Sequence, residues 1–316
     1  MQKLVKTDCD IFYISYGPSL QLVKHEFPKV NCIDIGGLSL FETVRKISES
    51  VDNISGFIDL QKNSRSIAVK YLLRLKHRFT FFSYRKHSFD KRLAVLKART
   101  AKRISNSEID WPNLPTVKLL MQNSFLECIE TLSLSQNEAA QTQASENNPS
   151  TTIAIAAGAS HQVKTIPAEI VFEIISSLST QISGLKVILL GDKNDKTLND
   201  IIETQLKETV EVLNLTGAIS LDKIPELLAS VKCLISSDSA ILHLANFHGI
   251  HSVSLFGPTI ESLGYGTSSK LNTPFSSPIS CRPCSRNGDK DCRFDDKKCF
   301  SGIDKEEVVK RILAYT

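Results

Sequence analysis

The sequence predicts an α/β protein with two Rossmann-like domains, each built around a parallel sheet. Two observations support this fold class. Short β-rich runs alternate with segments of helical periodicity, and a polar stretch interrupts the alternation once before it resumes. Strict alternation of strand and helix is typical of a parallel sheet. A chain of 316 residues is long enough for two such domains, and we expect their sheets to face each other across a cleft.

The first half of the chain contains four expected strands and two expected helices. The strand runs are short and rich in aromatic and β-branched residues, and the helical runs repeat their apolar residues every three or four positions. The strands are expected at Asp10–Ser15, Asn31–Ile35, Ser55–Leu60 and Arg78–Ser83, and the helices at Leu38–Ser50 and Ser64–Leu75.

A polar stretch then separates the two halves. Residues Ser135–Thr152 read SQNEAAQTQASENNPSTT, which lacks large apolar residues and cannot contribute to a core. We therefore predict an N-terminal domain at 1–133, a linker at 134–152 and a C-terminal domain at 153–316.

The second half repeats the alternation with five expected strands and four expected helices. It ends in a cysteine-rich stretch at 281–299 without apolar periodicity. The strands are expected at Thr152–Ala157, Lys186–Leu190, Val210–Leu215, Cys233–Ser237 and Ser252–Phe256, and the helices near Pro167–Thr180, Leu198–Glu208, Leu221–Val231 and Ala240–His248.

Composition excludes several classes of protein. With 41% hydrophobic and 23% charged residues, the chain is neither disordered nor a collagen or coiled-coil rod. No apolar run is long enough to span a membrane, and the N-terminus has no signal-like apolar core, so we expect a cytoplasmic protein.

The net charge of +4 is concentrated in one stretch. Twelve Lys or Arg residues lie between Lys70 and Arg103, against the single acidic residue Asp90. This stretch either binds an anion or forms a solvated face that acids elsewhere balance. The residues alone leave both interpretations open.

Three turns in the second half place polar groups at the carboxyl ends of expected strands, where ligands of parallel sheets bind. The first, Ala156–Ser160, is rich in small residues and precedes Lys164, so it suits an anion, but the signal is weak by itself and a tight turn with a surface lysine is the alternative. The second, Ser236–His243, places Asp238 and Ser239 at a helix start that could receive a phosphate; the alternative is a capping Asp and a core histidine. The third, Leu255–Thr259, indicates only a turn.

Taken in order, these segments resemble glycosyltransferase family 9, the heptosyltransferases that move heptose from ADP-heptose onto the lipopolysaccharide inner core. The resemblance rests on AAGAS with KTIP at 156–167, NLTG at Asn214–Gly217, SSDSAILHLA at Ser236–Ala245, SLFGPT at Ser254–Thr259 and, in the first half, IDLQ with SRS at Ile58–Ser66. It implies a GT-B architecture with the donor in the C-terminal domain, and inverting transfer without a metal or other catalytic cofactor.

The resemblance also implies which residues bind the donor. Lys164 matches the lysine that meets the donor diphosphate, and Asp238, Ser239 and His243 match a D-S/T-G-x-x-H segment in which Ala240 stands where most members have glycine. The implied partners are an ADP-sugar and a phosphorylated or acidic saccharide acceptor held by the Lys70–Arg103 stretch, with peripheral contact at the inner face of the membrane and no nucleic acid. The full set of expected donor-binding residues is Gly158, Ser160, Lys164, Thr216, Gly217, Asp238, Ser239, Ala240 and His243.

The family's general base is not found in this chain. Members begin with a strand and a Gly-Asp loop whose Asp deprotonates the acceptor, whereas Met1–Thr7 reads as the tail of the first helix. We interpret Asp10, Asp34 and Asp59 as turn or strand-end residues and leave the catalytic residue unassigned. Three explanations stay open: a start codon placed too far downstream, a degenerate gene copy, and a divergent member with another base.

The eight cysteines fall into two groups. Cys9, Cys32, Cys128 and Cys233 are scattered on apolar patterns and are expected in the core. The other four have the spacing C-x2-C-x7-C-x6-C, which predicts a structural zinc site that braces a loop near the donor; an iron–sulfur cluster, disulfides and free thiols are the alternatives. The four predicted metal ligands are Cys281, Cys284, Cys292 and Cys299.

The sequence therefore favours an inverting sugar transferase. The main alternative is a truncated or degenerate family member that binds nucleotide without catalysis, and the missing Gly-Asp loop separates the two. A nucleotide-sugar epimerase and a nucleic-acid-binding module are further alternatives. The nucleic-acid module is disfavoured because the basic stretch lacks an array of aromatic residues for stacking.

Overall fold

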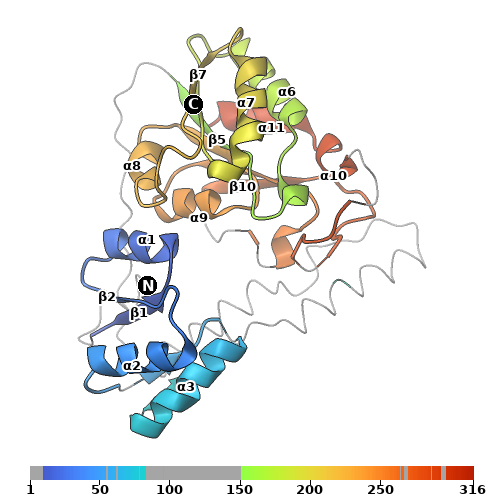
Figure 1. Cartoon of the computed structure of the whole chain (residues 1–316). Helices are drawn as coiled ribbons and strands as arrows, with labels where there is room; N and C mark the ends of the chain where they lie inside the picture. The colour runs from blue at the N-terminus through green and yellow to red at the C-terminus, as the bar shows by residue number, and fades with distance from the viewer. Residues whose placement is uncertain are drawn as a thin grey trace. The chain divides into compact units, whose positions relative to one another are not determined.

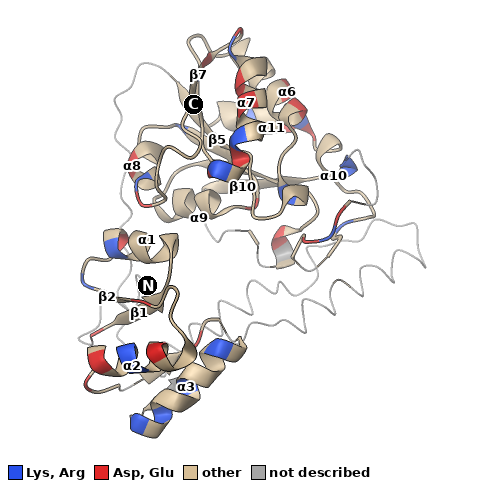
Figure 2. Ribbon diagram, in the orientation of Figure 1, with Lys and Arg blue, Asp and Glu red and all other residues tan. Residues whose placement is uncertain are grey.

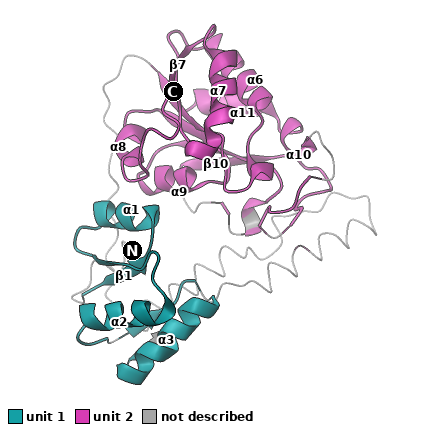
Figure 3. Ribbon diagram, in the orientation of Figure 1, with its two compact units in different colours: residues 1–87, 119–140 teal, residues 88–118, 141–316 magenta. Residues whose placement is uncertain are grey.

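A computed structural model of the chain confirms an α/β protein with parallel sheets (Figure 1). The chain divides into two compact units, residues 1–87 with 119–140 (unit 1) and residues 88–118 with 141–316 (unit 2), as Figure 3 shows. The structure describes residues 10–54, 56–61, 63–77, 79–82, 95, 151–263, 265–266, 270–285, 287–292 and 297–316.

Unit 1 contains two short parallel pairs of strands, β1 with β2 and β3 with β4. All four predicted strands and both predicted helices are confirmed, with ends trimmed or extended by a residue or two. Helix α1 was not predicted, because only Leu20 and Val23 on it are buried and the apolar pattern is too short to recognise. The elements are β1 Phe12–Ser15, α1 Pro18–Glu26, β2 Asn31–Asp34, α2 Leu40–Ser50, β3 Gly56–Ile58, α3 Ser64–Lys76 and β4 Thr80–Phe82.

The two longer helices of unit 1 begin at capping boxes. Ser39 and Glu42 bond each other's backbone N–H at the start of α2, and Asn63 and Ser66 do the same at α3. The two helices pack against each other. Their buried apolar residues belong to the core of unit 1, which consists of Ile33, Val44, Ile47, Val51, Ile54, Val69 and Leu73.

Unit 2 is built on a six-stranded, fully parallel sheet in the order β10-β9-β8-β5-β6-β7. The strand order reverses beside β5, at the point where ligands bind in sheets of this kind. The strands are β5 Thr152–Ala156, β6 Lys186–Leu189, β7 Glu211–Asn214, β8 Cys233–Ser236, β9 Ser252–Phe256 and β10 Asn272–Ser276, and the α-helices are α6 Ala168–Ser179, α7 Lys196–Leu206, α8 Ile224–Leu228, α9 Ala240–Phe247, α10 Lys298–Ser301 and α11 Lys305–Leu313.

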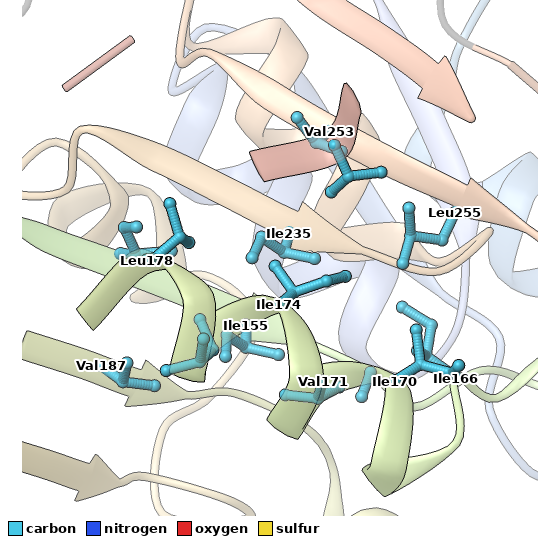
Figure 4. Close-up of a cluster of buried hydrophobic side chains, with 14 of the residues drawn as sticks. Ile155, Ile166, Ile170, Val171, Ile174, Leu178, Val187, Ile235, Val253 and Leu255 are labelled. Carbon is cyan, nitrogen blue, oxygen red and sulfur yellow. The ribbon is translucent and has the colours of Figure 1, made fainter. Parts of the chain in front are cut away.

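Helices cover the sheet of unit 2. Helices α6, α7 and α11 lie together, and α8 lies beside α9 (Figure 1). Figure 4 shows how the buried face of α6, which includes Val171, Ile174 and Leu178, meets side chains of the central strands such as Ile155 and Ile235. This packing holds the carboxyl ends of the strands, and the loops that follow them, on a rigid base.

Three strands or α-helices of unit 2 were not predicted, namely β10, the four-residue helix α10 and α11. Strand β10 is an edge strand that contains Pro274 and polar residues, so its sequence lacks an apolar alternation. Helix α11 has a recognisable pattern, since Asp304 caps it and Val308 and Ile312 are buried. Of the predicted linker, only Thr151 and Thr152 lie within the described residues, and Thr152 begins β5.

The described part of the basic stretch is on α3. This helix carries Arg65, Lys70, Arg74 and Lys76 and no acidic residue (Figure 2). The other basic residues of the stretch, from Arg78 to Arg103, lie outside the described residues. Among the helices that the structure describes, none is long and apolar enough to cross a membrane.

Candidate functional site

The first two predicted turns lie side by side at the carboxyl edge of the sheet in unit 2. They follow the paired strands β5 and β8, and their backbones are joined directly. The Ser237 N–H donates to the carbonyl of Ala156 over 3.0 Å, and the Ser237 hydroxyl donates to the carbonyl of Gly158. The small residues of the first turn allow this close approach.

A buried ion pair between Lys164 and Asp238 is the centre of the site. The Lys164 Nζ atom lies 2.9 Å from Asp238 Oδ2, and the two side chains are 7% and 9% exposed. The hydroxyl of Thr259, in the third turn, donates to the same carboxylate oxygen over 3.4 Å. The centroid of the Tyr265 ring lies 5.0 Å from Lys164 Nζ. Tertiary folding thus brings residues of all three predicted segments to one ion pair.

The start of α9 lies next to this ion pair in the chain. Ser239 is the N-cap residue, its hydroxyl accepts from the Leu242 N–H over 3.5 Å, and it is 2.9 Å from the Ser236 hydroxyl. A helix N-terminus carries about half a positive charge. The lysine and the helix end therefore provide positive charge, and the Asp238 carboxylate offsets part of it.

The fourth predicted segment, around Thr216 and Gly217, joins the site through the loop after β6. The Gly217 N–H donates to the carbonyl of Gly191 over 2.9 Å. In the same loop, the Asp195 carboxylate packs so closely on Gly158 that a Cβ there would lie 2.0 Å from Asp195 Oδ1. Burial raises the pKa of this carboxyl group. The segments after β5, β6 and β7 therefore form one continuous surface.

Four of the predicted donor-binding residues are exposed: Ser160, Gly217, Ala240 and His243. Gly158, Lys164 and Asp238 are buried. The role of His243 as a ligand of the same anion stays a prediction. The added methyl group of Ala240 lies on the exposed first residue of α9.

The four clustered cysteines lie close enough to influence one another. Burial raises the pKa of Cys299 to about 11, and Cys284, Cys281 and Cys292 also raise it, while Arg282 lowers it. Within the described residues, however, no three or more His, Cys, Asp or Glu side chains form a group that could hold a metal ion. The zinc site stays a prediction.

The other cysteines are partly described. Cys233 is fully buried in β8, as expected of a core residue, and burial raises its pKa to about 12. Cys32 on β2 is half-buried, and burial raises its pKa as well. Cys9 and Cys128 lie outside the described residues.

The acidic residues of the first half have local structural partners. Asp34 ends β2 and accepts from the Gly36 N–H over 2.8 Å. Asp59 follows β3, is buried, and accepts from the Gln61 N–H over 3.0 Å and the Ser66 hydroxyl over 2.9 Å. Asp10 is exposed before β1. These positions agree with the interpretation of turn and strand-end residues. Met1–Thr7 lies outside the described residues.

Sequence reasoning missed four residues of the site. Thr259 was recognised only as part of a turn, although a hydroxyl at the end of a strand was a usable signal. Tyr265 and Arg282 gave no signal, because each reaches the site from an irregular segment after β9. Asp195 was also missed, and its position is set by the packing of two loops.

Comparison with known proteins gives a family and a fold. A sequence model of glycosyltransferase family 9 (heptosyltransferase) matches residues 59–294. No curated protein sequence gives a significant match.

Three solved structures are similar over almost the whole chain. A family 9 glycosyl transferase from Veillonella parvula is 17% identical with a TM-score of 0.65, covering 96% of this chain and 89% of that one. Escherichia coli ADP-heptose lps heptosyltransferase II is 17% identical with a TM-score of 0.65, covering 99% and 93%. E. coli heptosyltransferase WaaC with ADP is 14% identical with a TM-score of 0.60, covering 98% and 100%.

At these identities the structural likeness bears on the fold, which is of the GT-B type and confirms the predicted fold class. The family follows from the sequence model, which spans well over half of the chain and includes the segments around Lys164, Asp238 and Thr259. The chain belongs to glycosyltransferase family 9, the heptosyltransferase family.

Proposed function

We propose that this chain transfers a heptose-type sugar from an ADP-sugar to a phosphorylated or acidic acceptor of the lipopolysaccharide inner core, with inversion and without a catalytic metal. The observation that supports the proposal is the buried Lys164–Asp238 pair beside the start of α9, at the carboxyl edge of a parallel sheet. Among similar proteins, heptosyltransferase WaaC was solved with ADP, which supports the donor class.

The reaction requires positive charge at the leaving group. The acceptor hydroxyl oxygen bonds to the anomeric carbon on the face opposite the diphosphate, the bond from that carbon to the diphosphate oxygen breaks, and ADP departs with the bonding electrons. Lys164 and the N-terminal N–H groups of α9 would stabilise the negative charge that develops on the diphosphate. Asp238 would hold the ammonium group in place before the donor binds.

The proton of the acceptor hydroxyl needs a base, and this residue is unassigned. Asp34 and Asp59 already accept hydrogen bonds from their own loops, which is typical of structural carboxylates. A chain that binds the donor but lacks a base would correspond to the non-catalytic alternative.

The acceptor and the place of action are also part of the proposal. The basic residues of α3, Lys70, Arg74 and Lys76, would attract phosphate or carboxylate groups of the acceptor. The same charge suits an anionic membrane surface. We propose a cytoplasmic enzyme that works at the inner face of the membrane.

A structural zinc ion is a further element of the proposal. Four thiolates are a donor set that Zn²⁺ prefers, and the other three cysteines of 281–299 each raise the pKa of Cys299, although the described side chains do not form a metal-binding group. The ion would brace this segment and take no part in bond making. Purification without chelators followed by elemental analysis tests it: one zinc per chain, lost in a Cys281→Ser/Cys284→Ser variant, is expected, and a metal-free folded chain would contradict it.

Calorimetric titration of ADP tests the donor site directly. We expect ADP to bind the wild-type chain and Lys164→Ala to weaken binding at least tenfold, about 1.4 kcal/mol. Lys310→Ala is the matched control, because that lysine is 79% exposed on α11 in the same unit. No binding by a folded wild-type chain would refute the proposal.

A transfer assay then separates the two main alternatives. With ADP-heptose and a heptose-deficient inner-core acceptor, release of ADP with formation of a new glycosidic bond is expected. Binding of ADP without any transfer would favour the degenerate, non-catalytic family member.

A further inference from the structure

Arg282 is buried next to the donor site and bonds the backbone of the turn that contains Thr259. Its side chain donates through Nη2 to the carbonyl of Thr259 and through Nη1 to the carbonyl of Ser277, each over 2.6 Å. The residue is only 4% exposed. Burying a guanidinium group is costly unless its N–H groups are bonded, so these two carbonyls define where the side chain lies.

The carbonyl of Thr259 connects Arg282 to the ion pair. The hydroxyl of the same residue donates to Asp238 Oδ2, the oxygen that also accepts from Lys164 Nζ. Arg282 therefore bonds the backbone of Thr259, the Thr259 hydroxyl bonds the Asp238 carboxylate, and this carboxylate pairs with the Lys164 ammonium group. All four side chains are buried.

Two residues that follow Arg282, Cys284 and Gly288, also contact the turn at Thr259 or the Lys164 side chain. The Cys284 N–H donates to the carbonyl of Pro258 over 3.0 Å, which ties the segment to the same turn. At Gly288, a Cβ would lie 2.8 Å from Thr259 Cγ2 and 2.9 Å from Lys164 Cε. The segment and the lysine side chain are thus in direct contact.

We propose that Arg282 is a positioning residue of the donor site, which acts through Thr259 and Asp238 to set the place of the Lys164 ammonium group. The inference rests on the proposed donor site and adds a residue to it. Lysine at this position would keep the charge but could not bond both carbonyls as a planar fork.

A double-mutant cycle with ADP calorimetry tests this. Four proteins are compared: wild type, Arg282→Lys, Lys164→Ala and the double variant. We expect Arg282→Lys to raise the Kd for ADP about five- to tenfold in the wild-type background and less than twofold in the Lys164→Ala background, because the group it positions is then gone. Arg311→Lys, on the exposed side of α11, is the matched control and should leave the Kd unchanged.

A second variant tests whether Arg282 acts through the contact of Thr259 with Asp238. Thr259→Val removes the hydroxyl that contacts Asp238 but keeps the carbonyl that Arg282 bonds, so it should raise the Kd about threefold or more with the arginine in place. If Arg282→Lys does not fold, the Kd of Thr259→Val tests the positioning role in its place. Thermal unfolding of each variant shows which proteins are folded.

The outcomes separate this inference from the proposed function. If wild type binds ADP and depends on Lys164, but folded Arg282→Lys binds within twofold of wild type, the positioning role is wrong and the donor site stands. An equal loss in both backgrounds, or a Thr259→Val variant without effect, would likewise overturn it. Absence of ADP binding by wild type would overturn both.

Discussion

Removing the charge of Asp238 should destabilise unit 2 strongly, because Lys164 would then be a buried cation without its counterion. At a separation of 2.9 Å, Coulomb's law with an effective dielectric constant of about 20 gives an attraction of about 6 kcal/mol. Desolvation offsets much of this in the intact pair. Deleting one partner of a buried pair typically costs about 3–5 kcal/mol.

We expect the lower end of that range for Asp238→Asn, about 3 kcal/mol. The amide oxygen can still accept from Lys164, and the Tyr265 ring, 5.0 Å from Nζ, offers the ammonium group a weak cation–π contact. Adding Lys164→Met removes the unpaired charge. The loss of unfolding free energy in the double variant should therefore be smaller than the sum of the losses in the two single variants by at least about 2 kcal/mol.

Hydrogen exchange is the appropriate assay, since it reports on each unit separately. The amides of Ile153 and Ile155, in the centre of the sheet, should open only with the unfolding of unit 2. Glu211→Gln is the matched control: that residue pairs with Lys186 at the same 2.9 Å, but the two side chains are 68% and 42% exposed. Glu211→Gln should lower the unfolding free energy of unit 2 by less than about 1 kcal/mol. A similar small loss for Asp238→Asn, or strict additivity in the double variant, would refute this reasoning.

Three further predictions concern packing, capping and titration. Gly257→Ala should cost unit 2 about 1–3 kcal/mol, because a Cβ there would lie 2.3 Å from Phe300 Cε2; exchange of the β5 amides measures it, and no loss would mean that the ring moves aside. Ser39→Ala should speed amide exchange in α2 through the loss of about 1 kcal/mol of capping, while Ser50→Ala, at the far end of that helix, should not. Cys233 has a pKa of about 12, against 9.0 for an ordinary thiol, so it is almost wholly protonated at pH 8 and iodoacetamide should modify it only after unfolding. Labelling of Cys233 itself in the folded chain at pH 8, located by peptide mapping, would contradict its burial.

The fold was largely predictable, because local signals determine most of its elements. The strands β5, β8 and β9 are apolar runs that end at small or polar turn residues, and such runs are recognisable without knowledge of their neighbours. Strand β10 shows the limit. It contains Pro274 and polar residues, and it becomes a strand only because the edge of β9 is available for pairing.

The candidate site was predictable in outline. Parallel pairing places the turns after β5, β8 and β9 at one edge, so Lys164 and Asp238 could be assigned to a common region from the order of elements. Their direct ion pair could not be predicted. Lys164 and Asp238 are 74 residues apart in the chain, so they meet only when the strands that precede them are paired in register.

Sequence by itself determined the alternation of strands and helices, the start of α9 at Ser239 and the family, because these depend on residues close together in the chain or on their order. Only tertiary structure decided that Arg282, Thr259, Asp238 and Lys164 form one buried chain of contacts. Irregular segments have no periodicity to read, and the place of a buried charge is set by whichever partners the completed fold offers it.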